Sequence, residues 1–129
     1  MAKWKFESLA ENGVYVMERG EKISYIKKQA AGAGYFFARV NVKNANDKRA
    51  LLGALARALK FPAYFGMNWD ALEDSLRDLS PARGYVIVLS GFSALPEKMA
   101  EEAEILTKIL ESSARYWQAK DIPFLIFLS

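Results

Sequence analysis

Four carboxylates are concentrated in one short stretch of this sequence, and they are its best candidates for chemistry: Asp70, Glu73, Asp74 and Asp78. The stretch follows an aromatic loop that contains Pro62. The chain has no histidine and no cysteine, so it lacks the usual general base near neutral pH, thiolate nucleophiles and most zinc ligands. Carboxylates alone could still bind a cationic partner or hold a magnesium ion.

Charge is spread unevenly along the chain. Residues 1–60 carry 12 Lys/Arg and 5 Asp/Glu, whereas residues 61–80 carry 1 Lys/Arg and 4 Asp/Glu. Residues 81–129 carry 5 Lys/Arg and 6 Asp/Glu, and the formal charge of the whole chain is +3. Because acid is concentrated against the general trend, the 61–80 segment suits binding of a cationic partner better than catalysis.

The sequence predicts a short helix over 69–79 with two distinct faces. Asn68 is a favourable N-cap for it. One face carries three leucines: Leu72, Leu76 and Leu79. Every fourth residue turns by only about 40° around a helix, so three aspartates form a second stripe: Asp70, Asp74 and Asp78. Leu72 lies about 200° from Asp70, so the acids point away from the leucine face.

Each of these residues also has a simpler structural interpretation. Acids are common in the first turn of a helix because the helix dipole favours them, and a run of charges is usually a solvated face. Asn68 could be only a cap, and Gly66 only a loop residue with a positive φ angle. The neighbouring aromatic residues could all belong to the core. Their occurrence together within a dozen residues of the acids favours a binding edge.

The rest of the sequence predicts one α/β domain over residues 1–129. Strands are expected over 13–18, 35–42, 85–90 and 122–128, and helices over 21–31, 48–60, 69–79 and 97–119. Strand 85–90, YVIVLS, is almost continuously apolar, as expected when both faces are covered. The alternation of strands and helices predicts a parallel sheet with right-handed crossovers.

The loop and acidic helix resemble the barstar family, which are intracellular inhibitors of small secreted ribonucleases. The pattern Pro-x-Tyr-aromatic-Gly-x-Asn-x-Asp-Ala-Leu-x-Asp runs from Pro62 to Asp74. The order of elements over 35–129 also agrees with the family's small parallel-sheet fold. The resemblance implies a barstar-like core of three strands over 35–129. It does not cover residues 1–34, an N-terminal extension in which the strand expected over 13–18 adds a fourth strand to the sheet.

The resemblance implies a partner-binding surface of eight residues: Tyr64, Phe65, Gly66, Asn68, Trp69, Asp70, Glu73 and Asp74. Tyr64 and Phe65 fall where the family places aromatics against the nuclease, and Gly66 and Asn68 shape the loop. Asp70 and Asp74 fall on the family's two key acids, and the second enters the nuclease active site in place of a substrate phosphate. Trp69 and Glu73 differ from the best-known member, which has an aliphatic residue and a tryptophan there.

The resemblance therefore implies an inhibitor of a small basic ribonuclease that is not an enzyme and uses no cofactor or metal. No apolar run reaches the ~20 residues needed to span a bilayer, and the first residues lack the apolar stretch of a secretory signal. A cytoplasmic location is expected.

Three alternatives stay open. A non-inhibitory barstar-like interaction module is suggested by the N-terminal addition and the changed contact positions. Direct nucleic-acid binding is suggested by a group of basic and aromatic residues near the N-terminus, although a solvated helix face explains them better: Lys3, Trp4, Lys5, Arg19, Lys22, Tyr25, Lys27 and Lys28. An acid-based metal nuclease built on Asp70 and Asp74 ranks last, because further ligands at a recognisable spacing are lacking.

Overall fold

Strands and helices alternate in the predicted order in the computed structural model, which describes residues 11–18, 20–62 and 65–129. The elements are β1 Gly13–Val16, α1 Ile23–Ala33, β2 Phe36–Asn41, α2 Lys48–Ala58, α3 Trp69–Leu76, β3 Tyr85–Ser90, α4 Ala100–Gln118 and β4 Phe124–Leu128. Two 3₁₀ turns, Phe92–Ala94 and Glu97–Met99, lie between β3 and α4. None of the helices in the described ranges is long and apolar enough to cross a membrane.

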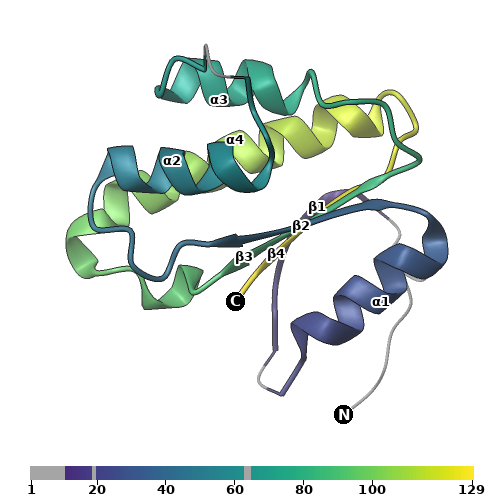
Figure 1. The fold of residues 1–129 in the computed structure, drawn as a ribbon, viewed down its shortest axis with the longest axis horizontal. Helices are drawn as coiled ribbons and strands as arrows, with labels where there is room; N and C mark the ends of the chain where they lie inside the picture. Colours follow the sequence, from purple (N-terminus) through teal and green to yellow (C-terminus); the bar gives the residue numbers. More distant parts are fainter. Residues whose placement is uncertain (1–10, 19, 63–64) are drawn as a thin grey trace.

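The four strands form one parallel sheet with the spatial order β1-β4-β3-β2 (Figure 1). In its register Tyr85 lies between Phe36 on one side and Phe124 on the other. Every residue of β3 and β4 is buried, because these strands are flanked by other strands and covered on both faces. The prediction of an α/β fold with four parallel strands is therefore confirmed.

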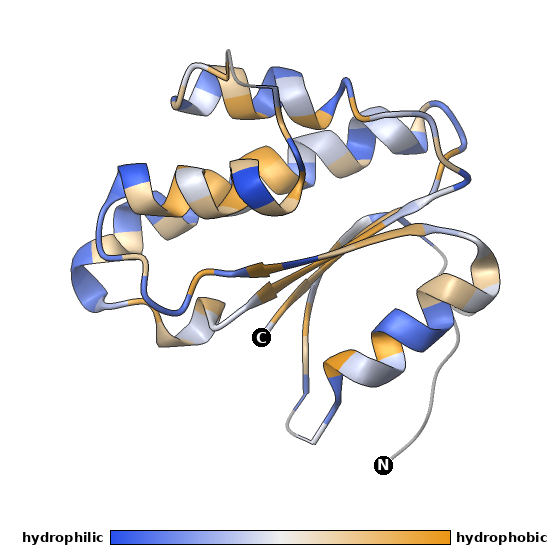
Figure 2. Ribbon diagram, viewed as in Figure 1, coloured by the Kyte–Doolittle hydropathy of each residue, from blue (hydrophilic) through white to orange (hydrophobic). Residues whose placement is uncertain are grey.

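Helices cover both faces of the sheet (Figure 1), with α2, α3 and α4 on one side and α1 alone on the other. The strands are mostly hydrophobic, which gives each helix an apolar surface to pack on (Figure 2). The larger core lies on the three-helix side and includes Leu51, Leu72, Ile87 and Leu106. The smaller core joins α1 to the opposite face: Ile26, Ala30, Val86, Val88, Leu125 and Phe127.

Asn12 connects the start of β1 to α4 and to the approach to β4. Its side-chain amide donates to the carbonyl oxygens of Ala114 at 3.3 Å and Ile122 at 2.8 Å. Its side-chain oxygen accepts from the backbone N–H of Phe124 at 2.8 Å, and its own backbone N–H donates to the Gln118 side chain at 2.9 Å. Residue 12 is therefore bonded to a segment more than a hundred positions away in the sequence.

Several predicted boundaries were wrong by a few residues. Residues 97–99 form a 3₁₀ turn, so the long helix begins at Ala100 instead of 97. The last strand begins at Phe124 instead of 122, since Pro123 has no N–H to donate to a neighbouring strand. The Pro123 carbonyl still accepts from the Tyr85 N–H at 2.9 Å. The helix predicted over 48–60 ends at Ala58, and Lys60 takes a left-handed φ of 57°.

Candidate partner-binding site

Asn68 caps α3, as the sequence predicts, and also holds the preceding loop. Its side-chain oxygen accepts from the Ala71 N–H at 2.7 Å, while its amide donates to the Gly66 carbonyl at 3.2 Å. One side chain thus satisfies an otherwise unpaired N–H at the helix start and fixes the loop that leads into it.

Gly66 does not adopt the positive φ angle that was one interpretation of it from the sequence. The positive φ of this loop belongs to Met67, at 51°, and Gly66 is not among the glycines with positive φ. A Cβ atom added at Gly66 would lie only 3.1 Å from the Asn68 amide nitrogen. The absence of a side chain at Gly66 therefore leaves room for the capping side chain of Asn68.

The two faces of α3 separate apolar and acidic residues as predicted from the sequence. Leu72 and Leu76 are 0% exposed and pack in the larger core. The helix predicted over 69–79 ends at Leu76, so Asp70 and Asp74 lie on α3 and Asp78 lies just beyond it. All three aspartates are exposed, and none has an ion pair with another residue in the described ranges. We refer to these three aspartates as the acidic stripe. Its carboxylates are available to a partner.

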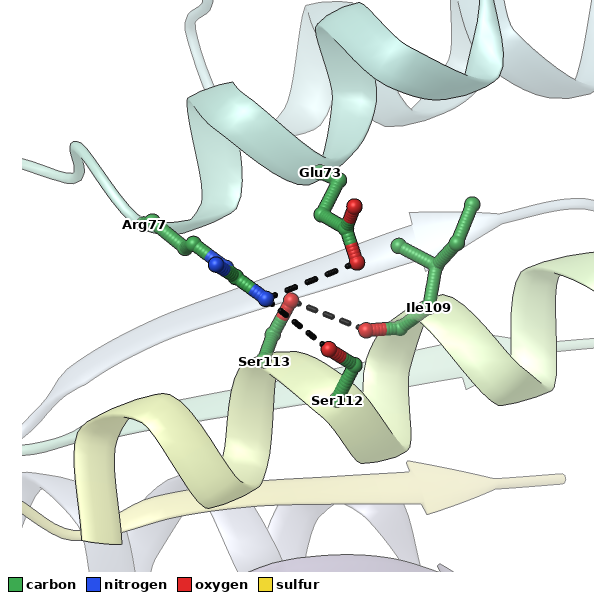
Figure 3. A network of polar contacts seen from close by, with 5 residues as sticks. All are labelled: Glu73, Arg77, Ile109, Ser112 and Ser113. Carbon is green, nitrogen blue, oxygen red and sulfur yellow. Dashed lines mark hydrogen bonds and ion pairs between the residues drawn. The ribbon is translucent and has the colours of Figure 1, made fainter. Parts of the chain in front are cut away.

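Glu73 faces α4 instead of lying in the acidic stripe (Figure 3). Its carboxylate is 3.6 Å from the Arg77 guanidinium, which also donates to the Ser112 hydroxyl at 2.9 Å. The same guanidinium lies 5.2 Å from the centre of the Tyr116 ring. The side chains of the ion pair are 39% and 36% exposed, so we expect it to contribute only about 0.3–0.5 kcal/mol to stability. Its main effect is to direct the charge of Glu73 towards a cation of the same chain.

Phe65 before α3 and Trp69 at its start are partly buried. Trp69 packs against the larger core, and the Lys48 ammonium lies 5.8 Å from the centre of its ring. Phe65 contacts Phe61, with ring centres 5.0 Å apart. Tyr64, which the sequence places in the same surface, lies outside the described residues.

The C-terminal end of α3 is held by Trp117 of α4. The indole N–H donates to the Leu76 carbonyl at 2.9 Å, in a buried position. The Trp117 ring also stacks on Phe124, with an interplanar angle of 12°, and contacts Tyr85 at 5.0 Å. The sequence pattern indicated Trp117 only as an apolar position of a helix, since helical spacing carries no information about the partner of an indole N–H. With Asn68 at one end and Trp117 at the other, α3 is fixed at both ends.

A pocket of about 290 Å³ adjoins the acidic stripe. Asp74 and Asp78 line one part of it, and Lys60 also reaches it from the end of α2. Its apolar lining includes Phe61 and Phe65. Asp78 does not belong to the eight residues that the resemblance implied, and its position in this pocket is visible only in the folded chain. We refer to this cavity as the Asp78 pocket.

Metal binding has no support from the arrangement of acids. Within the described part of the chain, no group of three or more His, Cys, Asp or Glu residues is placed to hold a metal ion.

A comparison with protein families matches residues 35–129 to the family model described as Barstar (barnase inhibitor). The chain belongs to the Barstar family. The matched region runs from β2 to β4 and contains the capped loop, α3 and the Asp78 pocket, whereas β1 and α1 precede it. The search of curated proteins gave no match. The Barstar assignment thus covers the whole candidate surface.

Proposed function

We propose that this Barstar-family protein inhibits a small basic ribonuclease by blocking its active site with the edge formed by α3 and the loop before it. The observation that carries the proposal is that Asp70 and Asp74 are exposed, and have no ion pair within the described residues, on a helix fixed at both ends. A ribonuclease active site is cationic because it binds RNA phosphates. Carboxylates can occupy such a site in place of a phosphate.

Rigidity and charge support this proposal in different ways. Because Asn68 and Trp117 fix α3, little conformational freedom is lost when its carboxylates meet a partner. A carboxylate can accept two parallel hydrogen bonds from one guanidinium. Loss of water from Asp74 is offset only if the partner supplies such cationic donors. The same residues thus favour a cationic partner over a neutral one.

The other residues of the proposed surface surround these two acids. Phe65, Gly66, Asn68 and Trp69 form the loop side of the edge, and Tyr64 belongs to the same proposal. Glu73 has the weakest place in it, because its carboxylate faces Arg77. The proposed action is steric and electrostatic blocking without catalysis. The proposal includes a cytoplasmic location, where such an inhibitor would meet a secreted ribonuclease before export.

The test is a titration of the purified protein into barnase, the ribonuclease named in the family description, and then into other small basic ribonucleases. We expect RNA hydrolysis to fall to zero near one equivalent of inhibitor for a true target. Asp70→Ala and Asp74→Ala each remove hydrogen bonds to charged groups, so each is expected to weaken inhibition by roughly 10- to 100-fold. Glu101→Ala, at an exposed position of α4, is the matched control.

The proposed mechanism is wrong if Asp74→Ala inhibits a verified target as tightly as the original protein.

One observation favours a second function, a non-inhibitory interaction module. Glu73 replaces an aromatic contact of the family and is turned towards α4 by Arg77. A pull-down with an Asp70→Ala/Asp74→Ala double variant separates the two functions. A partner that binds this variant unchanged must use another surface.

A further inference from the structure

We infer that the Asp78 pocket accepts one arginine side chain of the partner, with Asp78 as a specificity-determining residue. This inference deepens the proposed function and rests on it for the identity of the partner. Asp78 lies outside the eight-residue surface, two residues beyond the end of α3 at Leu76. The partner would therefore place one cation against Asp74 and a further guanidinium in the adjoining pocket.

The shape of the pocket suits a single long side chain. Its volume of about 290 Å³ lies at the lower limit of small-molecule sites, which typically measure about 300–1,000 Å³. Among the described residues, its lining comes from the segment that follows α2 and from the end of α3 with the residues just after it. A space of this size is enough for one side chain from a protein surface.

The apolar part of the pocket suits the body of an arginine. Phe61 and Phe65 lie with ring centres 5.0 Å apart and planes inclined by 45°, and Leu79 lines the pocket with them. The methylene groups of an arginine gain from such a surface while its charged end stays near carboxylates. A guanidinium also stacks on an aromatic face, where it is attracted by the ring electrons.

The charges of the pocket favour a cation. Asp74 lies on α3 and Asp78 lies two residues beyond its end, and both acidic residues line the same pocket, where their like charges repel each other. Neither has an ion pair with Lys60, which also lines the pocket, and the formal charge of the three groups together is −1. A cation placed between the two carboxylates relieves their repulsion.

The two separated carboxylates favour arginine over lysine. A guanidinium is planar and presents five N–H donors, so it can bond two carboxylates while one face lies against an aromatic ring. An ammonium is a compact point charge that satisfies one carboxylate well and stacks poorly. The combination of Asp74, Asp78 and the two phenylalanine rings therefore matches the guanidinium more closely.

The test is an NMR titration of the full chain with Nα-acetyl-L-arginine amide, without any ribonuclease. We expect saturable shifts of the Phe61, Phe65 and Leu79 signals with a dissociation constant in the millimolar range. Nα-acetyl-L-citrulline amide has nearly the same shape without the charge, and it is expected to produce no saturable shift. Nα-acetyl-L-lysine amide is expected to bind more weakly than the arginine derivative.

Variants identify the carboxylate responsible. Asp78→Asn removes one exposed charge and is expected to weaken binding of the arginine derivative by about two- to fivefold. Asp121→Asn makes the same chemical change at an exposed residue that does not line the pocket, and it is expected to leave binding unchanged. The backbone amide spectrum shows that both variants are folded.

The inference is overturned if the arginine derivative gives no saturable shifts, if the citrulline derivative binds equally well, or if Asp78→Asn binds like the original protein. None of these outcomes bears on inhibition of barnase, which depends on Asp70 and Asp74 in the separate assay. Conversely, saturable arginine binding together with failure to inhibit any ribonuclease would support the pocket and contradict the proposed function.

Discussion

Replacing Asn12 by alanine should destabilise the whole fold, although this residue lies outside the region matched to the Barstar family. The change removes three side-chain hydrogen bonds, to the carbonyls of Ala114 and Ile122 and from the N–H of Phe124. It leaves the N–H of Phe124, a fully buried residue, without its partner. We therefore expect the residues before β2 to unfold together with the core.

The magnitude follows from the number of bonds. A hydrogen bond contributes about 0.5–1.5 kcal/mol net, and an unpaired buried donor costs about 1–3 kcal/mol, so we expect Asn12→Ala to lower the free energy of unfolding by about 2–4 kcal/mol. For a chain of this size that loss lowers the thermal midpoint by roughly 10 °C. At low pH, where the carboxyl group is neutral, Asn12→Asp keeps an acceptor for Phe124 and one O–H donor in place of the two N–H donors, so its effect should be intermediate.

The assay is urea unfolding followed by circular dichroism and by tryptophan fluorescence. Both signals should shift together to lower urea with an unchanged slope, as expected for one cooperative unit. Asn46→Ala, at an exposed position before α2, is the control and should change stability by less than about 0.5 kcal/mol. A loss of less than about 0.5 kcal/mol for Asn12→Ala would refute the reasoning, because the observed bonds would then contribute almost nothing.

Three further predictions concern alkaline stability, two glycines and the rate of association. Burial raises the pKa of Tyr85 above its usual value of about 10, and its hydroxyl donates to the Ser80 carbonyl at 2.7 Å. The stability that this tyrosine contributes is therefore complete below about pH 10 and is lost as the pH rises through the folded-state pKa. Tyr85→Phe should lower the free energy of unfolding by about 1 kcal/mol at neutral pH and should reduce the loss of stability at alkaline pH. Urea unfolding at several pH values measures both effects. Gly91→Ala should lower the free energy of unfolding by about 1–3 kcal/mol in the same assay, since Gly91 has a φ of 83° and an added Cβ would lie 2.8 Å from the Lys43 Cα. Gly32→Ala, in an open helical position, should raise it by about 0.4–1 kcal/mol. Equal effects at the two sites would contradict this reasoning. Added salt should slow association with a target ribonuclease much more than it speeds dissociation, because salt screens the long-range attraction between the acidic stripe and a cationic surface. Stopped-flow fluorescence measures the association rate. An association rate that does not respond to salt would argue against an electrostatic encounter.

Local patterns in the sequence were enough to predict the order of the elements and the two faces of α3. The apolar run of β3 indicated a strand covered on both sides, and its six buried residues agree. Asn68 could be predicted as a cap because capping depends on residues three positions apart. These features share one property, since each is determined by neighbours along the chain.

The contacts that were missed join residues far apart in the sequence. The bond from Trp117 to the Leu76 carbonyl spans 41 positions, and that from Arg77 to Ser112 spans 35. The orientation of Glu73 depends on the second of these contacts, so its direction towards α4 could not be read from helical spacing alone. At Gly66 the interpretation as a positive-φ residue was wrong, and an added Cβ atom would instead lie close to the Asn68 side chain.

The position of β4 in the sheet also determines when the fold can form. β4 comes after the other three strands in the sequence, yet it lies between β1 and β3. During synthesis β2 and β3 can pair as soon as both have emerged, whereas β1 can pair only after β4 has been made. The first residue of β4, Phe124, is bonded to Asn12, 112 positions earlier in the sequence. Closing so long a loop is slow because its entropy cost comes before any contact is gained. The apolar side of α1 thus cannot pack against the complete sheet until β4 has been made. During that interval the exposed apolar surface of the nascent chain favours aggregation or binding by chaperones.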